Sequence, residues 1–207
     1  SSHALDQERV AGCEFAVAVF TNLTQDHLDY HPSLEHYLQA KLRLFRALGT
    51  GYLGTAVGKK LAVINRDDPS SPRFLEEARR SGAGVVSYGL EGPADVTAGD
   101  IRLTGEGTSF VVRTPAGEAP VNLPLVGRFN VYNALACLAT ALGEGVPLAL
   151  AVGALANAPQ VPGRFERLRE ARDFSVIVDY AHTPDGLRHV LQTAREITRG
   201  RVIVVFG

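Results

Sequence analysis

The chain has 207 residues, of which 45% are hydrophobic and 21% are charged, as in an ordinary globular protein of one large domain or slightly more. A net charge of −1 argues against a role based on non-specific binding to nucleic acid or to a membrane surface. No apolar run approaches the roughly 18 residues that a transmembrane helix needs.

Apolar runs alternate with helical patterns over the first ninety residues. The runs FAVAVF (15–20), KLAVIN (60–65) and GVVSYG (84–89) predict short strands that are buried on both faces. Residues 33–48 and 73–80 have the spacing of amphipathic helices. This alternation predicts an α/β fold with a mainly parallel sheet flanked by helices.

The pattern changes near Pro93. Residues 95–104, 107–114 and 117–125 alternate polar and apolar side chains, with glycine and proline between the segments. Such alternation is typical of antiparallel strands with one exposed face, and it predicts a small antiparallel insert. Helical patterns return in 128–158.

Two prolines and a glycine in APQVPGRFERL (158–168) predict a domain junction. We therefore expect one domain over residues 1–160 and the start of a second over residues 161–207. The second segment has the pattern strand, loop, helix, strand. This pattern predicts the first βαβ unit of another parallel-sheet domain.

The loop QDHLDYH (25–31) carries Asp26, His27, Asp29 and His31 directly after a predicted buried strand. Ligands gather at the carboxyl ends of strands in open α/β sheets, and oxygen and imidazole groups bind divalent cations. The alternative is a solvated loop in which Asp29 or Ser33 caps the following helix. The loop alone does not decide between these interpretations.

A lysine occupies an unexpected position in the helix that follows. Leu34, Leu38, Phe45 and Leu48 form the apolar face, and Lys41 lies at its centre. The lysine either extends its ammonium group to water along the apolar surface or is buried. A buried amine pairs with an acid or becomes neutral, and a neutral amine can add CO₂ to form a carbamate, an anionic oxygen ligand suited to Mg²⁺.

The segment TNLTQDHLDYHPSLEHYLQAKLRLF, together with SSHALDQERV, VPGRFERL and VDYAHTPDGL, resembles the Mur ligases, and their E-type members match best. The resemblance covers nearly all of the chain. It implies that residues 1–160 belong to the central ATPase domain, without its P-loop, and that residues 161–207 begin the Rossmann-like C-terminal domain. It also implies a monomer in the bacterial cytoplasm.

The resemblance implies an ATP-dependent amide ligase of peptidoglycan precursor synthesis. In the family, a substrate carboxylate attacks the γ-phosphate of ATP to give an acyl phosphate, which an incoming amine then attacks. For an E-type enzyme the substrates are UDP-MurNAc-L-Ala-D-Glu and a diamino acid, meso-diaminopimelate or L-lysine. Three alternatives remain open: another Mur or folylpolyglutamate-type ligase, a metal-dependent hydrolase, and a non-catalytic UDP-sugar-binding fragment.

By this resemblance, Lys41 matches the family's carbamylated lysine and His27 matches a ligand of the second Mg²⁺. Ser1, Gln7 and Arg9 match positions that hold the UDP-MurNAc-peptide. An arginine binds a carboxylate or diphosphate through two hydrogen bonds, whereas Gln7 is equally consistent with an exposed segment.

The resemblance also places nucleotide contacts on both predicted domains. Asn133, preceded by Asn130, matches the adenine-binding segment, although Asn130 is also suited to cap a helix. Arg164 and Asp179 match contacts from the C-terminal domain. His182 lies in the same loop as Asp179 and either lines the nucleotide site or is solvated.

Three parts of the family pattern are not among the 207 residues: the GTxGKT phosphate loop, a metal-binding glutamate before SSHA, and the motif that selects the diamino acid. A phosphate loop supplies both the phosphate cradle and a hydroxyl ligand to Mg²⁺. We therefore expect this chain to be a piece of a longer ligase, and we expect the 207 residues alone not to catalyse ligation.

Overall fold

The computed structural model describes residues 1–24, 30–50, 59–168 and 174–206. Its elements are, in chain order, α1 (Ser2–Asp6), β1 (Val17–Phe20), α2 (Leu34–Thr50), β2 (Leu61–Asn65), α3 (Ser71–Arg80), β3 (Gly84–Gly89), β4 (Val96–Thr104), β5 (Gly107–Thr114), β6 (Gly117–Leu123), α4 (Arg128–Gly143), α5 (Leu148–Leu155), β7 (Glu166–Leu168), β8 (Val176–Val178) and α6 (Pro184–Glu196). No helix within these ranges is both long enough and apolar enough to cross a bilayer.

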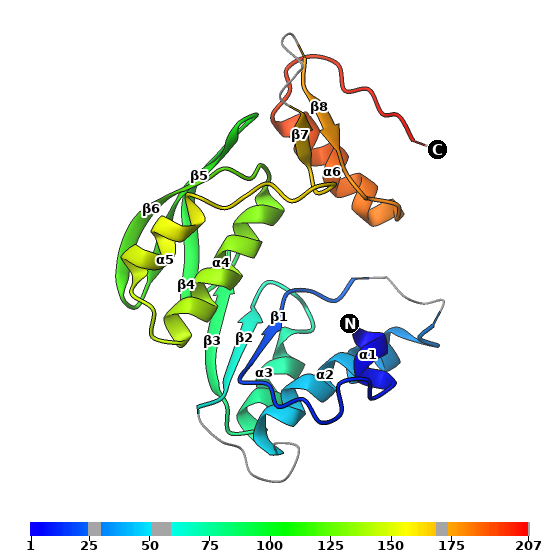
Figure 1. Ribbon diagram of the computed structural model, residues 1–207, viewed down its shortest axis with the longest axis vertical. Coiled ribbons are helices and arrows are strands. Elements are labelled where there is room, and N and C mark those ends of the chain that lie inside the picture. The colour runs from blue at the N-terminus through cyan, green and yellow to red at the C-terminus, as the bar shows by residue number, and fades with distance from the viewer. Residues whose placement is uncertain (25–29, 51–58, 169–173, 207) are drawn as a thin grey trace.

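One six-stranded sheet has the order β1-β2-β3-β4-β5-β6. Its first three strand pairs are parallel, and the pairs β4–β5 and β5–β6 are antiparallel. The α/β fold with a mainly parallel sheet is therefore confirmed. The predicted antiparallel segment is also confirmed, and it extends the same sheet, because β4 pairs with β3 (Figure 1).

Strand β2 is buried on both faces, and this decides the layering of the molecule. Leu61 and Val63 pack into the apolar cluster on the side of α4 and α5. Ala62 and Ile64 point the other way, into the cluster formed with α2 and α3. Because successive side chains of a strand alternate between faces, a wholly apolar LAVI run needs helices on both sides. Figure 1 shows the sheet between these two helical layers.

The layer under α2 and α3 is built around Phe74, whose side chain is fully buried. Its ring stacks on Phe20 of β1 with centroids 3.7 Å apart. It meets Phe45 of α2 edge-on at 5.0 Å. These contacts join a strand and two helices, so this aromatic cluster fixes the position of α2 over the sheet.

The C-terminal segment differs from the prediction in one respect. Strand β8 pairs antiparallel with β7, and residues 201–206 are not in a strand. An apolar run becomes a strand only where a neighbour accepts its backbone hydrogen bonds. Phe206 is 84% exposed and Val205 is 93% exposed, so the run VIVVF does not form the second parallel strand of the predicted βαβ unit.

Direct contacts join the C-terminal segment to the large sheet. The ring of Phe165 lies edge-on to that of Phe129, with centroids 6.1 Å apart. Arg167 Nη1 donates a hydrogen bond of 2.8 Å to the carbonyl of Gly105 in the β4–β5 turn. The start of α4 therefore lies next to the segment that precedes β7.

We predict that Phe74→Ala lowers the free energy of unfolding by about 3–5 kcal/mol, because it leaves a cavity between three packed elements. Leu150→Ala is the matched control, since the Leu150 side chain is 65% exposed and its truncation opens no cavity. Denaturant unfolding of the protein measures both values. Equal losses in the two variants would contradict the role of the aromatic cluster.

Candidate functional site

A polar turn follows β2 at the carboxyl edge of the parallel strands. Asn65 Nδ2 donates to the carbonyl of Thr21 at 2.7 Å. One carboxylate oxygen of Asp68 accepts from the backbone N–H of Leu23 at 2.7 Å, and the other accepts from Ser70 at 2.8 Å. Asn65 and Asp68 are both buried, so water competes little for these hydrogen bonds. They hold the start of the loop that leads from β1 towards α2.

Asp67, in the same turn, connects β3 to α4. Its Oδ2 accepts from the backbone N–H groups of Leu90 and Glu91 and from the hydroxyl of Tyr132, the last at 2.9 Å. Burial, and then the hydrogen bond to Asp67, raise the pKa of the Tyr132 hydroxyl well above its usual value, so this group remains a donor. The first turns of α4 are therefore anchored to the carboxyl edge of the sheet.

The two candidate asparagines lie one turn apart on α4 and differ in burial. Asn130 is buried, and its Nδ2 donates to the carbonyl of Val126 at 2.9 Å. Its Oδ1 accepts from Asn133 Nδ2 at 3.2 Å. Asn133 is exposed. Asn130 thus satisfies a backbone group before the helix and orients Asn133, which presents its amide oxygen at the surface.

Asp179 lies just after β8 and organises the loop around it. One carboxylate oxygen accepts from the backbone N–H of Phe165 and the other from that of Ala181, both at 2.7 Å. The carboxylate thereby joins the segment before β7 to the loop that precedes α6. Each oxygen keeps a further lone pair, so a hydroxyl donor can still bind it.

Three side chains gather beside this carboxylate. The guanidinium of Arg164 lies over the ring of Tyr180, 5.5 Å from its centroid. His182 Nδ1 lies 2.9 Å from the carbonyl oxygen of Tyr180, and the two rings meet edge-on at 4.9 Å. Arg164, Tyr180 and His182 are all exposed. The structure therefore brings together the candidate nucleotide residues Arg164, Asp179 and His182, with Tyr180 as an addition that sequence reasoning missed.

Lys41 is partly buried on α2, and its Nζ lies 5.0 Å from the ring centroid of Tyr37. Its neighbours Leu38, Phe45 and Leu48 are buried as predicted, but Leu34 is 45% exposed. The apolar face therefore begins after Leu34, and Lys41 lies at its partly solvated border rather than inside the core. His27, Asp26 and Asp29 fall outside the described residues.

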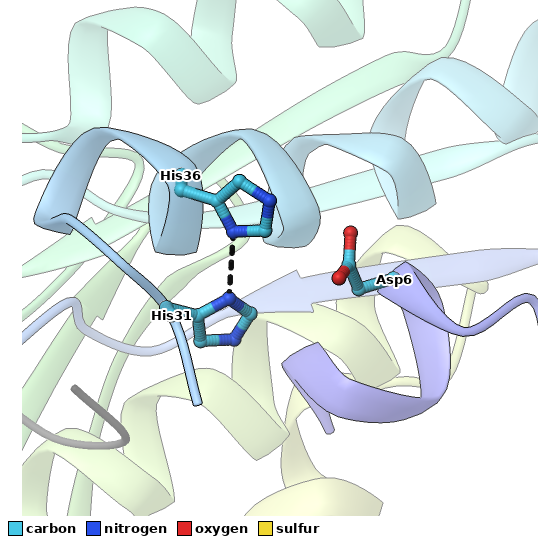
Figure 2. Close-up of side chains that lie close together, drawn as sticks. All are labelled: Asp6, His31 and His36. Atoms are coloured by element: carbon cyan, nitrogen blue, oxygen red, sulfur yellow. Dashed lines mark hydrogen bonds between the residues drawn. The ribbon is translucent and has the colours of Figure 1, made fainter. Parts of the chain in front are cut away.

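His31, from the same loop, is fully buried between α1 and α2. Its ring stacks on Tyr37 with centroids 5.0 Å apart. Its Nε2 lies 2.9 Å from Ser2 Oγ, and its Nδ1 lies 2.9 Å from Nδ1 of His36. Figure 2 shows the two imidazoles facing each other, with the carboxylate of Asp6 beside them.

The candidate substrate residues flank α1. Ser1 caps this helix, since its Oγ accepts from the backbone N–H of Ala4 at 3.3 Å. Gln7 and Arg9 follow the helix and are exposed. Arg43 of α2 holds α1 in place: its Nη1 donates to the carbonyl of Asp6 at 3.0 Å, and its Nη2 lies 3.2 Å from Asp6 Oδ1.

The site residues thus form two groups. Substrate candidates and Lys41 share the α1–α2 junction, and nucleotide candidates lie on α4 and on the loop around Asp179. Sequence reasoning missed the residues that position them: Asn65, Asp67, Asp68, Asp6 and His36. The motif Asn-x-Asp-Asp-Pro, which begins at the last residue of a buried strand, could have indicated the first three, because such side chains form hydrogen bonds with nearby backbone groups. His36 had no such signal, since it occupies an ordinary helix-surface position.

Comparison with protein families gives two matches. A model described as the Mur ligase middle domain matches residues 1–141. A second, described as the Mur ligase glutamate ligase domain, matches residues 163–207. Together the two matches include all the candidate residues named above.

Known relatives extend this result. The UDP-N-acetylmuramoyl-L-alanyl-D-glutamate–2,6-diaminopimelate ligase of Geobacillus kaustophilus is 49% identical over 207 residues, which are 100% of this chain and 41% of the relative. The ligase of that name from Synechococcus is also 49% identical, and the match again covers 100% of this chain and 41% of the relative. The chain therefore spans about two fifths of the length of these relatives.

Solved structures agree with the observed fold. The structure of a UDP-N-acetylmuramoyl-L-alanyl-D-glutamate–2,6-diaminopimelate ligase superposes with a TM-score of 0.79 and 36% identity, covering 95% of this chain and 39% of that one. MurF from Thermotoga maritima, solved with ADP, shares the fold with a TM-score of 0.72 at 20% identity, covering 89% of this chain and 40% of that one. The family models, the relatives and the fold agree, and the chain belongs to the Mur ligase family.

Proposed function

We propose that this chain is part of an ATP-dependent ligase that joins a diamino acid to UDP-MurNAc-L-Ala-D-Glu in peptidoglycan precursor synthesis. One observation carries the proposal: relatives named for this reaction with 2,6-diaminopimelate match the chain from end to end at 44–49% identity. The two family matches support a division into a central domain (1–160) and the start of a C-terminal domain (161–207).

The two groups of side chains suit two of the three substrates, ATP and the UDP-MurNAc-peptide. On α4, the exposed amide of Asn133 can accept a hydrogen bond from adenine. In the loop after β8, the guanidinium of Arg164 suits phosphate, and the carboxylate of Asp179 suits a ribose hydroxyl. His182, in the same loop, would line the nucleotide site. Beyond α1, Arg9 suits a carboxylate or diphosphate of the UDP-MurNAc-peptide, with Ser1 and Gln7 as further polar contacts.

In the proposed reaction the terminal carboxylate of the substrate attacks the γ-phosphate, and ADP leaves. The amine of the diamino acid then attacks the acyl carbon, and inorganic phosphate leaves. Two anions meet in the first step, so the chain must hold them in line and place positive charge around them. Residues on either side of α1, on α4 and in the Asp179 loop would position these groups.

Mg²⁺ would be held by His27 and by Lys41 in its carbamate form. The donor set fits a hard cation, because the carbamate offers carboxylate-like oxygens. When bound, the cation would neutralise charge at the γ-phosphate and at the attacking carboxylate.

The direct test is to incubate the whole natural protein with ATP, UDP-MurNAc-L-Ala-D-Glu and either meso-diaminopimelate or L-lysine. Mass spectrometry should detect the UDP-tripeptide together with ADP and phosphate. Extension of a folate substrate in place of the dipeptide would favour the folylpolyglutamate-type alternative. Tight binding of the UDP-dipeptide with no turnover under any of these conditions would favour a binding module.

We predict that Lys41→Arg lowers kcat by about 100-fold or more, because arginine keeps the positive charge but forms no carbamate. The control is Lys59→Arg, an exposed lysine whose Nζ lies 3.4 Å from the Gly143 carbonyl oxygen; its activity should change by less than about twofold. NMR in isotopically labelled bicarbonate should show a carbamate carbon that Lys41→Arg loses. Near-normal turnover by Lys41→Arg would refute the carbamate role.

We predict that Asn133→Ala raises the KM for ATP about 5- to 10-fold with little effect on stability, as expected for the loss of one hydrogen bond to the purine. Asn130→Ala should instead lower the free energy of unfolding by about 1–3 kcal/mol, because the Val126 carbonyl loses its buried donor. Asn157→Ala, an exposed asparagine near the end of α5, is the control. An unchanged KM for ATP in Asn133→Ala would exclude this adenine contact.

A further inference from the structure

Three side chains at the α1–α2 junction present metal-binding atoms to one another. Asp6, His31 and His36 each offer one ligand atom, and these atoms all lie within 4.8 Å of one another. None of the three is assigned to Mg²⁺ above. Two imidazoles with one carboxylate form a donor set for Zn²⁺ and neighbouring first-row transition metals, whereas Mg²⁺ prefers oxygen ligands.

The hydrogen bonds around the cluster orient its lone pairs inward. Ser2 Oγ lies 2.9 Å from His31 Nε2 and can accept that N–H, which leaves the lone pair of His31 on Nδ1, facing His36. A partner on the second ring nitrogen is the usual support of a metal-binding histidine. Tyr30 donates its hydroxyl to Asp6 Oδ2 at 2.9 Å and so orients the carboxylate in the same way.

The separation of the two imidazole nitrogens is close to the separation of two ligand atoms around a bound metal ion. With bonds of about 2.0–2.1 Å in a tetrahedral arrangement, two ligand atoms lie about 3.3 Å apart. The two Nδ1 atoms are 2.9 Å apart, held by a single shared proton. An ion that replaces this proton needs the rings to separate by a few tenths of an ångström and the Asp6 carboxylate to move inward by a rotation of its side chain.

Charge and burial allow a cation at this position. His31 is fully buried, and the Asp6 side chain is only 16% exposed, so the ligands are shielded from water. Arg43 pairs with this carboxylate, with its Nη2 3.2 Å from Asp6 Oδ1. Each carboxylate oxygen has two lone pairs, so the contacts with Arg43 and Tyr30 leave acceptor sites on Asp6 for an ion.

We propose that Asp6, His31 and His36 form a binding site for one transition-metal ion of the Zn²⁺ class, with the remaining coordination position filled by water. The ion takes the place of the proton between the two imidazoles, and that proton is released to solvent. Because Asp6 ends α1 and His36 lies in α2, the ion fastens α1, and with it the segment of Gln7 and Arg9, to the helix that carries Lys41.

The test is a Co²⁺ titration of the whole natural protein in excess Mg²⁺, followed by visible d–d absorption and by competition with Zn²⁺. One tightly bound Co²⁺ with the spectrum of a four- or five-coordinate site should appear, and Zn²⁺ should displace it. His36→Ala should weaken binding at least about 10- to 100-fold, the loss that even outer partners of a metal site cause. Asp6→Asn should weaken it by a smaller factor.

Two control variants locate the binding. His189→Ala, on α6, should bind Co²⁺ as the unaltered protein does. His27→Ala should also keep the signal, because His27 belongs to the proposed Mg²⁺ site; loss of the signal there would assign the ion to that site and overturn the proposal. No binding, equal binding by His36→Ala, or displacement by Mg²⁺ would also overturn it. His36→Gln, which preserves the side-chain size, replaces His36→Ala if circular dichroism shows the alanine variant to be unfolded.

Discussion

The arrangement of the site depends on the buried polar turn after β2. Asn65, Asp67 and Asp68 use their side chains to bind backbone groups of the β1 loop and of the segment after β3, and Asp67 also holds Tyr132 of α4. A buried polar group that loses its hydrogen-bond partner costs free energy, so these side chains and the backbone groups they bind hold one another in place. Three segments that are distant in sequence are therefore fixed at one edge of the sheet.

Helix α2 packs against the sheet with one face and contacts α1 with another. Leu38, Phe45 and Leu48 pack against the sheet, so the helix cannot shift without disrupting the core. Arg43 of the same helix contacts α1, where it forms an ion pair with Asp6 and hydrogen bonds to the carbonyls of Leu5 and Asp6. A rigid helix thus carries both Lys41 and the contacts that place the proposed substrate segment. In the proposed reaction, preorganisation of this kind would reduce the entropy lost when two anionic substrates are brought together.

The proposed nucleotide residues come from two parts of the chain, and aromatic contacts bring these parts together. Phe165 is buried against Phe129 near the start of α4. Its backbone N–H also binds Asp179, so one residue contacts the large sheet through its ring and the C-terminal loop through its amide. The start of α4, one turn before Asn133, is thereby connected to the loop that carries Asp179 and His182.

The sequence by itself determined the α/β class, the positions of the strands in the large sheet and the helices around it, because these follow from local periodicity and from apolar runs that only a two-sided sheet can bury. The resemblance to the Mur ligases rests on several motifs in order along the chain, among them QDHLDYH and VDYAHTPDGL, and the family matches confirm it. Only the tertiary structure decided that β4 continues the parallel sheet, that residues 201–206 do not form a strand, and that Lys41 lies at the border of the core. It alone brought Asp6 to His31 and His36. These outcomes depend on which backbone edges and side chains meet across long sequence separations, and no local pattern encodes that pairing.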